Sequence, residues 1–391
     1  MNILLFDGPE RNQLLPFTFI RPVAQLRIGI DLLQDKWEAL LGAKCGVYTQ
    51  TYLQAKYHIN EAKENLFVNP AYLPTQVLVN KINALALNDA LVIEGNIVAC
   101  LTKESHPPAN LTSLNTIPLE NDLLHISTAT DLFIHNDAVL TEDFRRLTAG
   151  RESAPISSSN QVIASENIFL EDGAKVECAI LNASNGPIYI GKNAEVMEGS
   201  MLRGSIALCE NAVVKMGAKI YGGTTLGPFV KAGGELNNVL ILGYSNKGHD
   251  GFLGNAVIGE WCNIGAASDA SNLKNNYGKL RVWNYSNESF IKTDLQFCGL
   301  LMGDYSRCSI HSTFNTATVV GVCANLFGTG FPRTFLPSFS YGGAQGLKTY
   351  AFDKALESNI AMMERRRVVL TSYDREVLQT VFDFTARWRK A

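Results

Sequence analysis

A six-residue spacing of aliphatic residues in the middle of the chain limits its fold more than any other feature. A period of six fits neither the 3.6-residue repeat of a helix nor the two-residue alternation of an isolated strand. It predicts a solenoid in which each short strand forms one side of a triangular coil, with the aliphatic side chain inward. The aliphatic positions are Ile190, Val196, Leu202, Leu208, Val214, Ile220 and Leu226, and small residues follow several of them at the expected corners (Ala194, Ser200, Ala212, Ala218, Thr224).

The same phase resumes twice further along the chain. It returns first with Phe252, Ile258 and Ile264, and then with Met302, Cys308, Phe314, Val320 and Leu326. Residues 243–254 separate the first two runs, so we interpret them as an insertion that projects from the coil as a loop. Polar insertions on a rigid scaffold are common positions for functional residues. His249 lies in this segment, and histidine is the side chain that most often serves as a general base in enzymes.

The first third of the chain mixes strand and helix signals. Residues 3–6, 46–49 and 90–93 are predicted to be strands, and the first and last of them end in turn residues. Asp31 is placed to cap a helix whose buried face would carry Leu33, Trp37, Leu40 and Leu41. Strand, helix and strand in this order predict an α/β domain with a parallel sheet, which binds ligands beyond the carboxyl ends of its strands.

The two ends of the repeat region have a different character. Residues 148–159 are polar and are interpreted as a linker, and the chain becomes helical after residue 343. Leu356, Ile360 and Met363 would share one helix face, and Thr371 or Ser372 could cap a last helix. We therefore expect domains at 1–150 and 160–345, followed by helices over 346–391. The run of arginines at 365–367 suits a solvated face or a subunit contact better than a substrate site.

The net charge, the apolar stretches and the cysteine pattern of the chain argue against several classes of function. The 391 residues carry a formal net charge of −3, which gives no reason to expect nucleic acid or an anionic membrane as partner. We find neither a signal peptide nor an apolar stretch long enough to span a bilayer. The eight cysteines form no CxxC pair, so they indicate a reducing compartment, and we expect a cytoplasmic protein.

Residues 247–279 carry a specific family resemblance. The run KGHDGFLGNAVIG, the step CNIGAAS that follows it, and the segment around Asn272 and NYGK are similar to the acetyltransferase domain of the bifunctional N-acetylglucosamine-1-phosphate uridylyltransferase/glucosamine-1-phosphate acetyltransferase family. The resemblance covers about residues 160–345. It implies a left-handed β-helix, a homotrimer, and acetyl-CoA as the acyl donor without a metal.

The resemblance also assigns roles to individual residues. His249 corresponds to the catalytic base, and Asn263 corresponds to an asparagine that contacts the sugar. Asn272 corresponds to a residue near the acyl donor. Lys231 and Lys279 are expected as partners of the sugar phosphate, and Lys247 is expected to bind the substrate. Phe252 stands where the family has a tyrosine, which removes one hydroxyl from the site.

Residues 6–11 (FDGPER), 14–18 (LLPFT) and 21–22 (RP) resemble a degenerate sugar nucleotidyltransferase signature. The overall pattern is similar to a divergent bacterial branch of such enzymes with hexapeptide tails. The resemblance implies a nucleotidyltransferase-like (Rossmann-like) α/β domain that uses a nucleoside triphosphate and a sugar-1-phosphate. Gly8, Arg11 and Arg21 would contact phosphate. Asn96 stands where the family has the aspartate that binds Mg²⁺, and Asp7 or Glu94 would supply the missing charge.

Three alternatives remain open at this stage. The N-terminal domain could be a working nucleotidyltransferase, or it could only bind a nucleotide or support the structure. The whole protein could be a non-catalytic sugar-nucleotide-binding or scaffold protein with decayed active sites. A γ-type carbonic anhydrase shares the β-helix but needs three histidines on zinc, and only His249 and His311 lie in the repeats, so we expect no zinc.

Overall fold

The chain folds into two compact units in this computed structural model, which describes residues 2–57, 59 and 62–389. The first unit holds most of the chain up to Thr128. The second holds the chain from Ala129 onward, together with Leu15–Phe17 and Arg27–Ile30. The division between the units therefore falls before the polar stretch that the sequence suggests as a linker.

The first unit is built on a six-stranded sheet in the order β2-β1-β3-β5-β4-β6. The predicted strands β1 and β2 are parallel, and β3, which the sequence analysis did not predict, also runs parallel to β1, so that Leu5 lies opposite both Val47 and Val68. The sheet is mixed and not parallel throughout, because β5 runs antiparallel to both β3 and β4. The strands are β1 (Asn2–Phe6), β2 (Gly46–Tyr48), β3 (Asn65–Val68), β4 (Asp89–Ile93), β5 (Asn96–Thr102) and β6 (Asn115–Pro118).

One helix of this unit, α1, lies where the apolar spacing indicated, whereas α2 and α3 were not predicted. Leu33 and Trp37 are buried on α1, as expected. The predicted cap at Asp31 is wrong, because Leu32 is the N-cap and its N–H donates to the carboxylate of Asp35. The helices of this unit are α1 (Leu33–Leu41), α2 (Thr51–Gln54) and α3 (Gln76–Asn83), with short 3-10 turns η1 (Pro9–Asn12) and η2 (Val23–Gln25).

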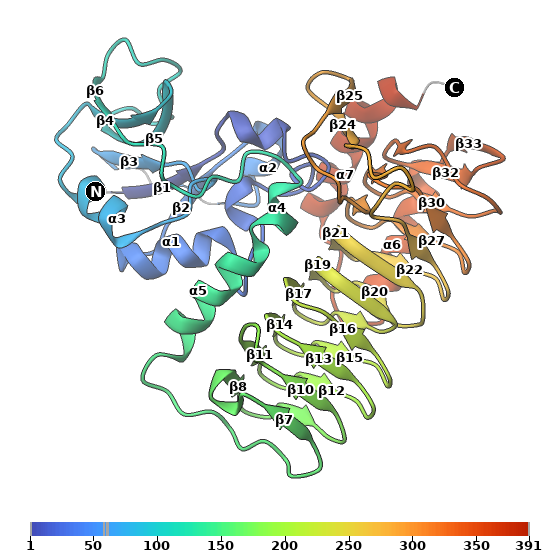
Figure 1. Ribbon diagram of the computed structural model, residues 1–391. Helices are drawn as coiled ribbons and strands as arrows, with labels where there is room; N and C mark the ends of the chain where they lie inside the picture. The colour runs from blue at the N-terminus through green and yellow to red at the C-terminus, as the bar shows by residue number, and fades with distance from the viewer. Residues whose placement is uncertain (1, 58, 60–61, 390–391) are drawn as a thin grey trace. The chain divides into compact units, whose positions relative to one another are not determined.

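The second unit is dominated by a left-handed parallel β-helix with three faces (Figure 1). Val196 pairs with Val214, Leu202 with Ile220, and Leu208 with Leu226. In each pair the partner comes three six-residue steps later in the chain. The six-residue period is therefore the length of one side of the coil, and the prediction of a triangular solenoid is confirmed.

The three faces are each a stack of short parallel strands. Face A comprises β7 (Gln161–Ile163), β10 (Ile180–Asn182), β13 (Met201–Arg203), β16 (Lys219–Ile220), the first halves of β19 (Glu235–Gly243) and β21 (Phe252–Glu260), β23 (Asp269–Ala270) and β28 (Thr313–Phe314). Face B comprises β9 (Lys175–Val176), β12 (Glu195–Val196), β15 (Val213–Val214), β18 (Lys231–Ala232), β20 (Asn246–Lys247), β22 (Asn263–Ile264), β27 (Arg307–Cys308), β30 (Asn325–Leu326) and β32 (Ser340–Gly343), with β33 (Gly346–Thr349) antiparallel at its end. Face C comprises β8 (Ile168–Leu170), β11 (Ile188–Ile190), β14 (Ile206–Leu208), β17 (Thr224–Leu226), the second halves of β19 and β21, β26 (Leu301–Met302), β29 (Val319–Val320) and β31 (Phe335–Leu336).

The interior of the coil is a continuous apolar column. The predicted inward residues are buried throughout the first and last runs, and the small residues at the corners are buried as well. One inward residue was predicted wrongly. Leu253 is 2% exposed and joins the core, whereas Phe252 faces outward opposite Glu235. The error arose because the inward residues Leu253 and Ile258 are five positions apart, one fewer than the six-residue step.

The predicted insertion at residues 243–254 is also wrong. Leu236 pairs with Leu253, so this segment forms an ordinary turn of the coil that is slightly shorter than three full sides. The real insertion follows β23. Ile258 pairs with Met302 and Ala270 with Phe314, so the chain between these partners is more than twice as long as in the regular turns. The insertion carries an antiparallel hairpin of β24 (Arg281–Asn284) and β25 (Ser289–Lys292).

Helices pack on the coil at two places. On α5 (Asn136–Thr148), which follows α4 (Asp131–Ile134), Leu140 is buried with Phe169 and Tyr189 of the coil. The C-terminal helices are α6 (Phe352–Glu364) and α7 (Ser372–Phe384), and the 3-10 turn η4 (Thr385–Trp388) follows α7 directly. A further 3-10 turn, η3 (Ser165–Asn167), precedes β8. None of the described helices is both long and apolar enough to cross a bilayer.

The apolar spacing of the C-terminal helices was predicted in part. Leu356 and Met363 are buried on α6 as expected, but Ile360 is exposed and Asn359 takes the buried position beside them. Thr371 caps α7, and its side chain and that of Asp374 form a capping box.

Candidate functional site

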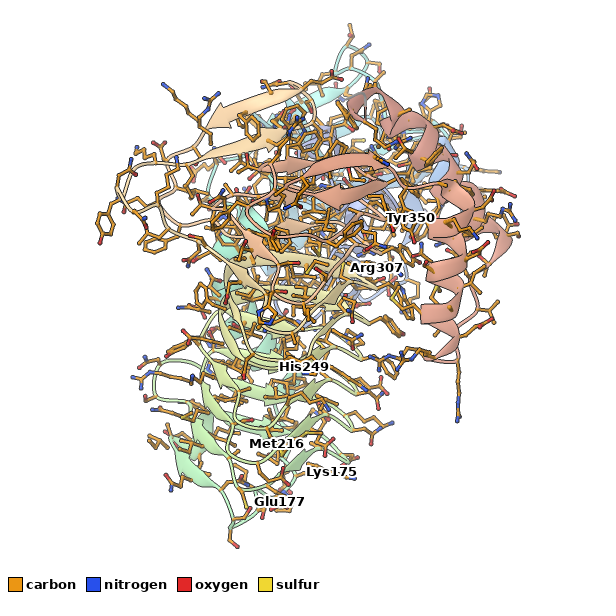
Figure 2. The ribbon with its side chains drawn as sticks, turned by 90° about the vertical axis from the view of Figure 1, so that its right-hand side faces the viewer. Lys175, Glu177, Met216, His249, Arg307 and Tyr350 are labelled. Atoms are coloured by element: carbon orange, nitrogen blue, oxygen red, sulfur yellow. The ribbon has the colours of Figure 1, made fainter. Side chains whose placement is uncertain are left out.

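A groove of about 790 Å³ lies along face B of the coil. Its floor contains four outward residues that the strand register places side by side, because Lys231 pairs with Asn246, Asn246 with Asn263, and Asn263 with Arg307. Neighbouring strands lie about 4.8 Å apart, so the four side chains form one polar row. Figure 2 shows His249 and Arg307 along the stacked turns of the coil.

Aromatic residues form one wall of the groove. Tyr244 and Trp261 occupy equivalent corners of successive turns, and both have left-handed backbone conformations. Their rings stack with centroids 4.4 Å apart, and Phe229 stacks on Tyr244 at 5.0 Å. The wall therefore presents flat apolar surface beside the polar row.

The end of α6 contributes arginines to the groove. Arg365 and Arg366 line it, and a guanidinium N–H of Arg366 donates to Oδ1 of Asn246 over 3.0 Å. Arg307 donates in turn to Oδ1 of the buried Asn359 over 2.6 Å, which fixes its direction. The sequence analysis favoured a solvated face or a subunit contact for these arginines. It therefore did not predict that Arg365 and Arg366 line the groove.

The groove is strongly cationic. The cations that line it are Lys215, Lys231, Arg307, Arg365 and Arg366, and no aspartate or glutamate is among the described lining residues. Burial lowers the pKa of Lys231, and repulsion from Arg366, Lys215 and Arg365 lowers it further. Burial also lowers the pKa of Arg366, with repulsion from Arg365. Because these cations repel one another, an anionic ligand that binds between them would be stabilised by their combined charge.

His249 lies at the mouth of this groove. It occupies the corner between β20 and β21, where its side chain is exposed and lines the groove together with Lys231 and Asn263. The structure thus brings together three of the residues that the sequence selected. The sequence analysis did not select Asn246, Trp261 or Arg307. Asn246 and Arg307 stand at the strand position of Asn263 in the neighbouring turns, so the repeat could have identified these two.

Two other selected residues lie outside the groove. Asn272 donates its amide N–H to Oδ1 of Asn255 over 2.8 Å at a different corner of the coil. Lys279 is in the inserted segment, where it forms an exposed ion pair with Asp294. The structure therefore does not place either of them beside His249 within one chain.

Lys247 does not face a substrate. Its side chain points into the coil and is only 2% exposed, next to Ala232 in the strand register. The expectation that it binds substrate directly is corrected by this position. In a two-residue strand the neighbouring residue faces the opposite side, so the outward residue here is Asn246.

The selected phosphate-binding residues of the first unit lie beyond β1, and they are largely engaged with their own unit. Arg11 donates to the carbonyl of Thr18 over 3.0 Å and to the hydroxyl of Tyr52 over 2.7 Å, and it lies 3.6 Å from the carboxylate of Asp7. Arg21 is buried. A Cβ on Gly8 would collide with the side chains of Glu10 and Asn69, so glycine is required there by packing within the protein.

The two residues selected for Mg²⁺ do not form one site. Asp7 accepts hydrogen bonds from the N–H of Val23 and from the hydroxyl of Thr49, and burial raises the pKa of its carboxyl. Asn96 lies at a tight β4–β5 turn, and β3 separates β5 from β1 in the sheet order. The pair therefore does not fit a hard cation, and the described residues contain no group of three or more His, Cys, Asp or Glu side chains that could hold a metal.

Glu10 and His125 form a largely buried pair that sequence reasoning missed. The carboxylate of Glu10 contacts Nε2 of His125 at 2.8 Å and accepts an N–H of Asn69 at 3.1 Å. Burial by itself would raise the pKa of Glu10, but these hydrogen bonds and the attraction of His125 outweigh it, and the pKa is lowered. The imidazole also stacks on Tyr72 at 4.1 Å between centroids.

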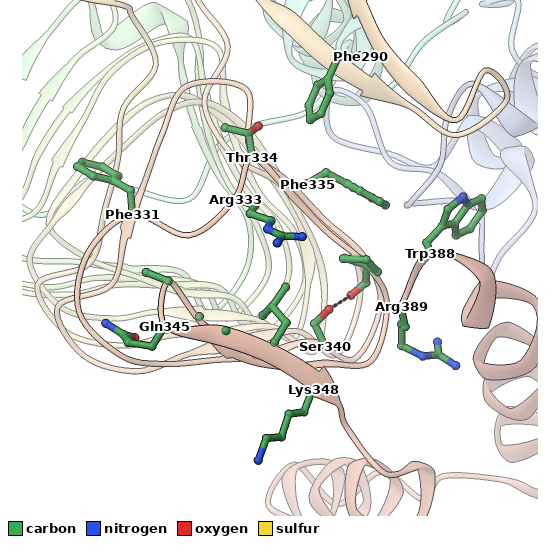
Figure 3. A pocket seen from close by; sticks show the side chains of 15 residues that line it. Phe290, Phe331, Arg333, Thr334, Phe335, Ser340, Gln345, Lys348, Trp388 and Arg389 are labelled. Atoms are coloured by element: carbon green, nitrogen blue, oxygen red, sulfur yellow. Dashed lines mark hydrogen bonds between the residues drawn. The ribbon is translucent and has the colours of Figure 1, made fainter. Parts of the chain in front are cut away.

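A second cavity, of about 840 Å³, lies at the C-terminal end of the coil. Figure 3 shows Arg333 pointing into it between the rings of Phe331 and Phe335. Arg389 at its far side is already engaged, because it donates to the carbonyls of Ser338 and Phe382. None of the described residues that line this cavity is a histidine, a cysteine or a carboxylate, so it offers no general base comparable to His249.

Comparison with known proteins supports the assignment of the N-terminal part. Residues 3–152 match the model of a family described as sugar nucleotidyl transferase. A search of curated proteins finds no match for the chain. The chain is therefore similar to sugar nucleotidyl transferases over its N-terminal part and continues as a left-handed β-helix, an architecture that fits the bifunctional uridylyltransferase/acetyltransferase family.

Proposed function

We propose that the protein is a two-part sugar-phosphate transferase. The first part would join a nucleoside triphosphate and a sugar-1-phosphate to give a nucleotide sugar. The coil would transfer an acetyl group from acetyl-CoA to an amino sugar phosphate. The match of residues 3–152 supports the first activity, and the groove on face B supports the second.

The observation that carries the acetyl-transfer proposal is the position of His249 at the edge of a cationic groove. The groove offers Lys231 and Arg366 to phosphate, and Asn263 to sugar hydroxyls. Both proposed substrates are phosphorylated, and both would be drawn to this cationic surface.

In the proposed reaction His249 acts as the general base. The amine nitrogen of the sugar attacks the thioester carbon, a C–N bond forms, and the imidazole accepts the proton from the nitrogen. The tetrahedral intermediate then collapses, the C–S bond breaks, and the thiolate of CoA leaves and takes up a proton. Backbone N–H groups would stabilise the oxyanion.

The test measures CoA release from acetyl-CoA with glucosamine-1-phosphate as acceptor. General-base catalysis contributes about 10²–10⁴-fold, so His249→Ala should lower kcat by about 100-fold or more. His311→Ala is the matched control, because His311 occupies the equivalent corner of a later turn and is not among the described residues that line the groove. Equal CoA release by wild type and His249→Ala would reject the assignment.

One observation favours a second candidate, in which only the coil is active. Arg11 and Asp7 are bound to other groups of their own unit, and neither is open for a triphosphate or a metal. Incubation with UTP or dTTP and sugar-1-phosphates decides between the two. Pyrophosphate release supports the full proposal, and its absence together with CoA release supports the coil-only alternative.

The family resemblance also leads us to propose a homotrimer. Light scattering on the purified full chain tests this directly. A monomer at micromolar concentration would contradict it.

A further inference from the structure

The inward residues of face B are apolar in every described turn except one. They are Val176, Val196, Val214, Ala232, Lys247, Ile264, Cys308 and Leu326. A buried ammonium is costly, so a lysine at a position that accepts valine or alanine elsewhere requires a specific partner.

That partner is the backbone of the residue proposed as the base. Nζ of Lys247 donates to the carbonyl oxygen of His249 over 2.5 Å. The side chain therefore remains buried and reaches from the core to the backbone of the corner that carries the imidazole. Asp250, Asp269 and the thiol of Cys308 also lie near the amine, and each favours its charged form.

The corner itself has little intrinsic rigidity. Gly248 precedes His249, and Gly251, with a φ of +118°, ends the corner. The N–H of Ala267 donates to the carbonyl of Asp250 over 2.9 Å, and the N–H of Glu235 donates to that of Gly251. These bonds hold the far end of the corner, and the bond from Lys247 holds the peptide of His249 itself.

We propose that Lys247 is a positioning residue that fixes the orientation of His249 through its main-chain carbonyl. The expected effect of Lys247 on kcat rests on the proposed acetyl transfer. Its expected effect on hydrogen–deuterium exchange of residues 248–251 does not. In the native protein the amine acts from inside the coil and never contacts the substrate. Burial lowers the pKa of this amine to about 8, despite the two carboxylates.

The test compares Lys247→Met with Lys219→Met. Methionine fills the apolar column at residue 247, and Lys219 is an exposed lysine on face A that serves as the control. Hydrogen–deuterium exchange of residues 248–251 should become about 10-fold faster in Lys247→Met, while residues 265–268 of the next turn keep their rate. Lys219→Met should leave both rates unchanged.

Kinetics supply the second readout. Misplacement of a catalytic group by about 1 Å can cost about 10²-fold in rate, so kcat for CoA release should fall by about 10- to 100-fold in Lys247→Met with KM changed less than about 2-fold. Unchanged exchange at residues 248–251 would overturn the proposal. If the wild type released no CoA, the acetyl-transfer proposal would fail, and the exchange experiment would still decide the role of Lys247.

A second variant protects the test against misfolding. Lys247→Ala reproduces the residue at position 232 of the preceding turn, so the coil tolerates it sterically. If both variants failed to fold by circular dichroism, Lys247 would be required for the coil as a whole, and a specific positioning role would be rejected.

Discussion

Nε2 of His125 lies 2.8 Å from a carboxylate oxygen of Glu10, and the two residues come from opposite ends of the first unit. Glu10 lies in the short turn η1 just after β1, whereas His125 lies beyond β6. The contact therefore ties the loop that resembles a phosphate-binding motif to the last segment of the unit.

Removal of this contact should destabilise the first unit. His125→Ala leaves the buried Glu10 carboxylate with one partner fewer, which should cost about 1–3 kcal/mol of unfolding free energy at pH 7. The pKa of Glu10 is lowered in the folded state, so this stabilisation is complete above pH 4.5 and is lost as the pH falls below it. Urea unfolding of both proteins at pH 7 and pH 4 measures the difference, and the exposed His106→Ala is the control. Equal stabilities at pH 7 would contradict this interpretation of the pair.

Removal of one cation from the groove should weaken substrate binding, and the size of this effect should depend on the salt concentration. Lys231→Gln removes a charge-assisted hydrogen bond, which is worth about 1.5–3 kcal/mol, so the KM for the sugar phosphate should rise by about 10-fold or more. The effect should shrink at high ionic strength, because salt screens the attraction of the remaining cations. Lys219→Gln on face A should leave the KM unchanged, and an equal rise in both variants would indicate a loss of overall charge and not a site.

Lys247 predicts an unusual dependence of stability on pH. Its pKa is depressed from 10.5 to about 8, so between these values the unfolded chain binds more protons than the folded protein. The stability of the wild type should therefore increase as the pH rises from 8 to 10.5, by about 3 kcal/mol from this group. Lys247→Met lacks the depressed amine, so its unfolding temperature at pH 7 should equal or exceed that of the wild type. A clear loss of stability at pH 7 would show that the ammonium stabilises the coil.

Shortening an inward side chain of the apolar column should greatly lower the free energy of unfolding of the coil. Leu226 is fully buried between successive turns, and Leu226→Ala should lower the unfolding free energy by about 2–5 kcal/mol. Met216→Ala, at an exposed corner, should change it by less than about 0.5 kcal/mol. Thermal unfolding of both variants, followed by circular dichroism, checks this contrast. Equal losses would mean that the six-residue period does not mark the core.

The sequence was most informative where structure depends on local repetition. Each turn of a solenoid packs on its neighbours, so Val196, Leu202 and Leu208 repeat the same environment and the period alone predicted the coil. It failed between Leu226 and Leu253, where shortened sides keep the strands in register with fewer residues. A spacing pattern cannot distinguish a shortened turn from an insertion, because both interrupt the period.

The site required tertiary structure. The sequence alone determined the triangular coil, and the family resemblance added His249, Lys231 and Asn263 as one group. Only the folded chain decided that Arg366 of a distant segment completes their groove, that Lys247 points inward, and that Glu10 meets His125. These contacts join residues far apart in the chain, and their formation depends on how helices and loops pack, which no local pattern of residues encodes.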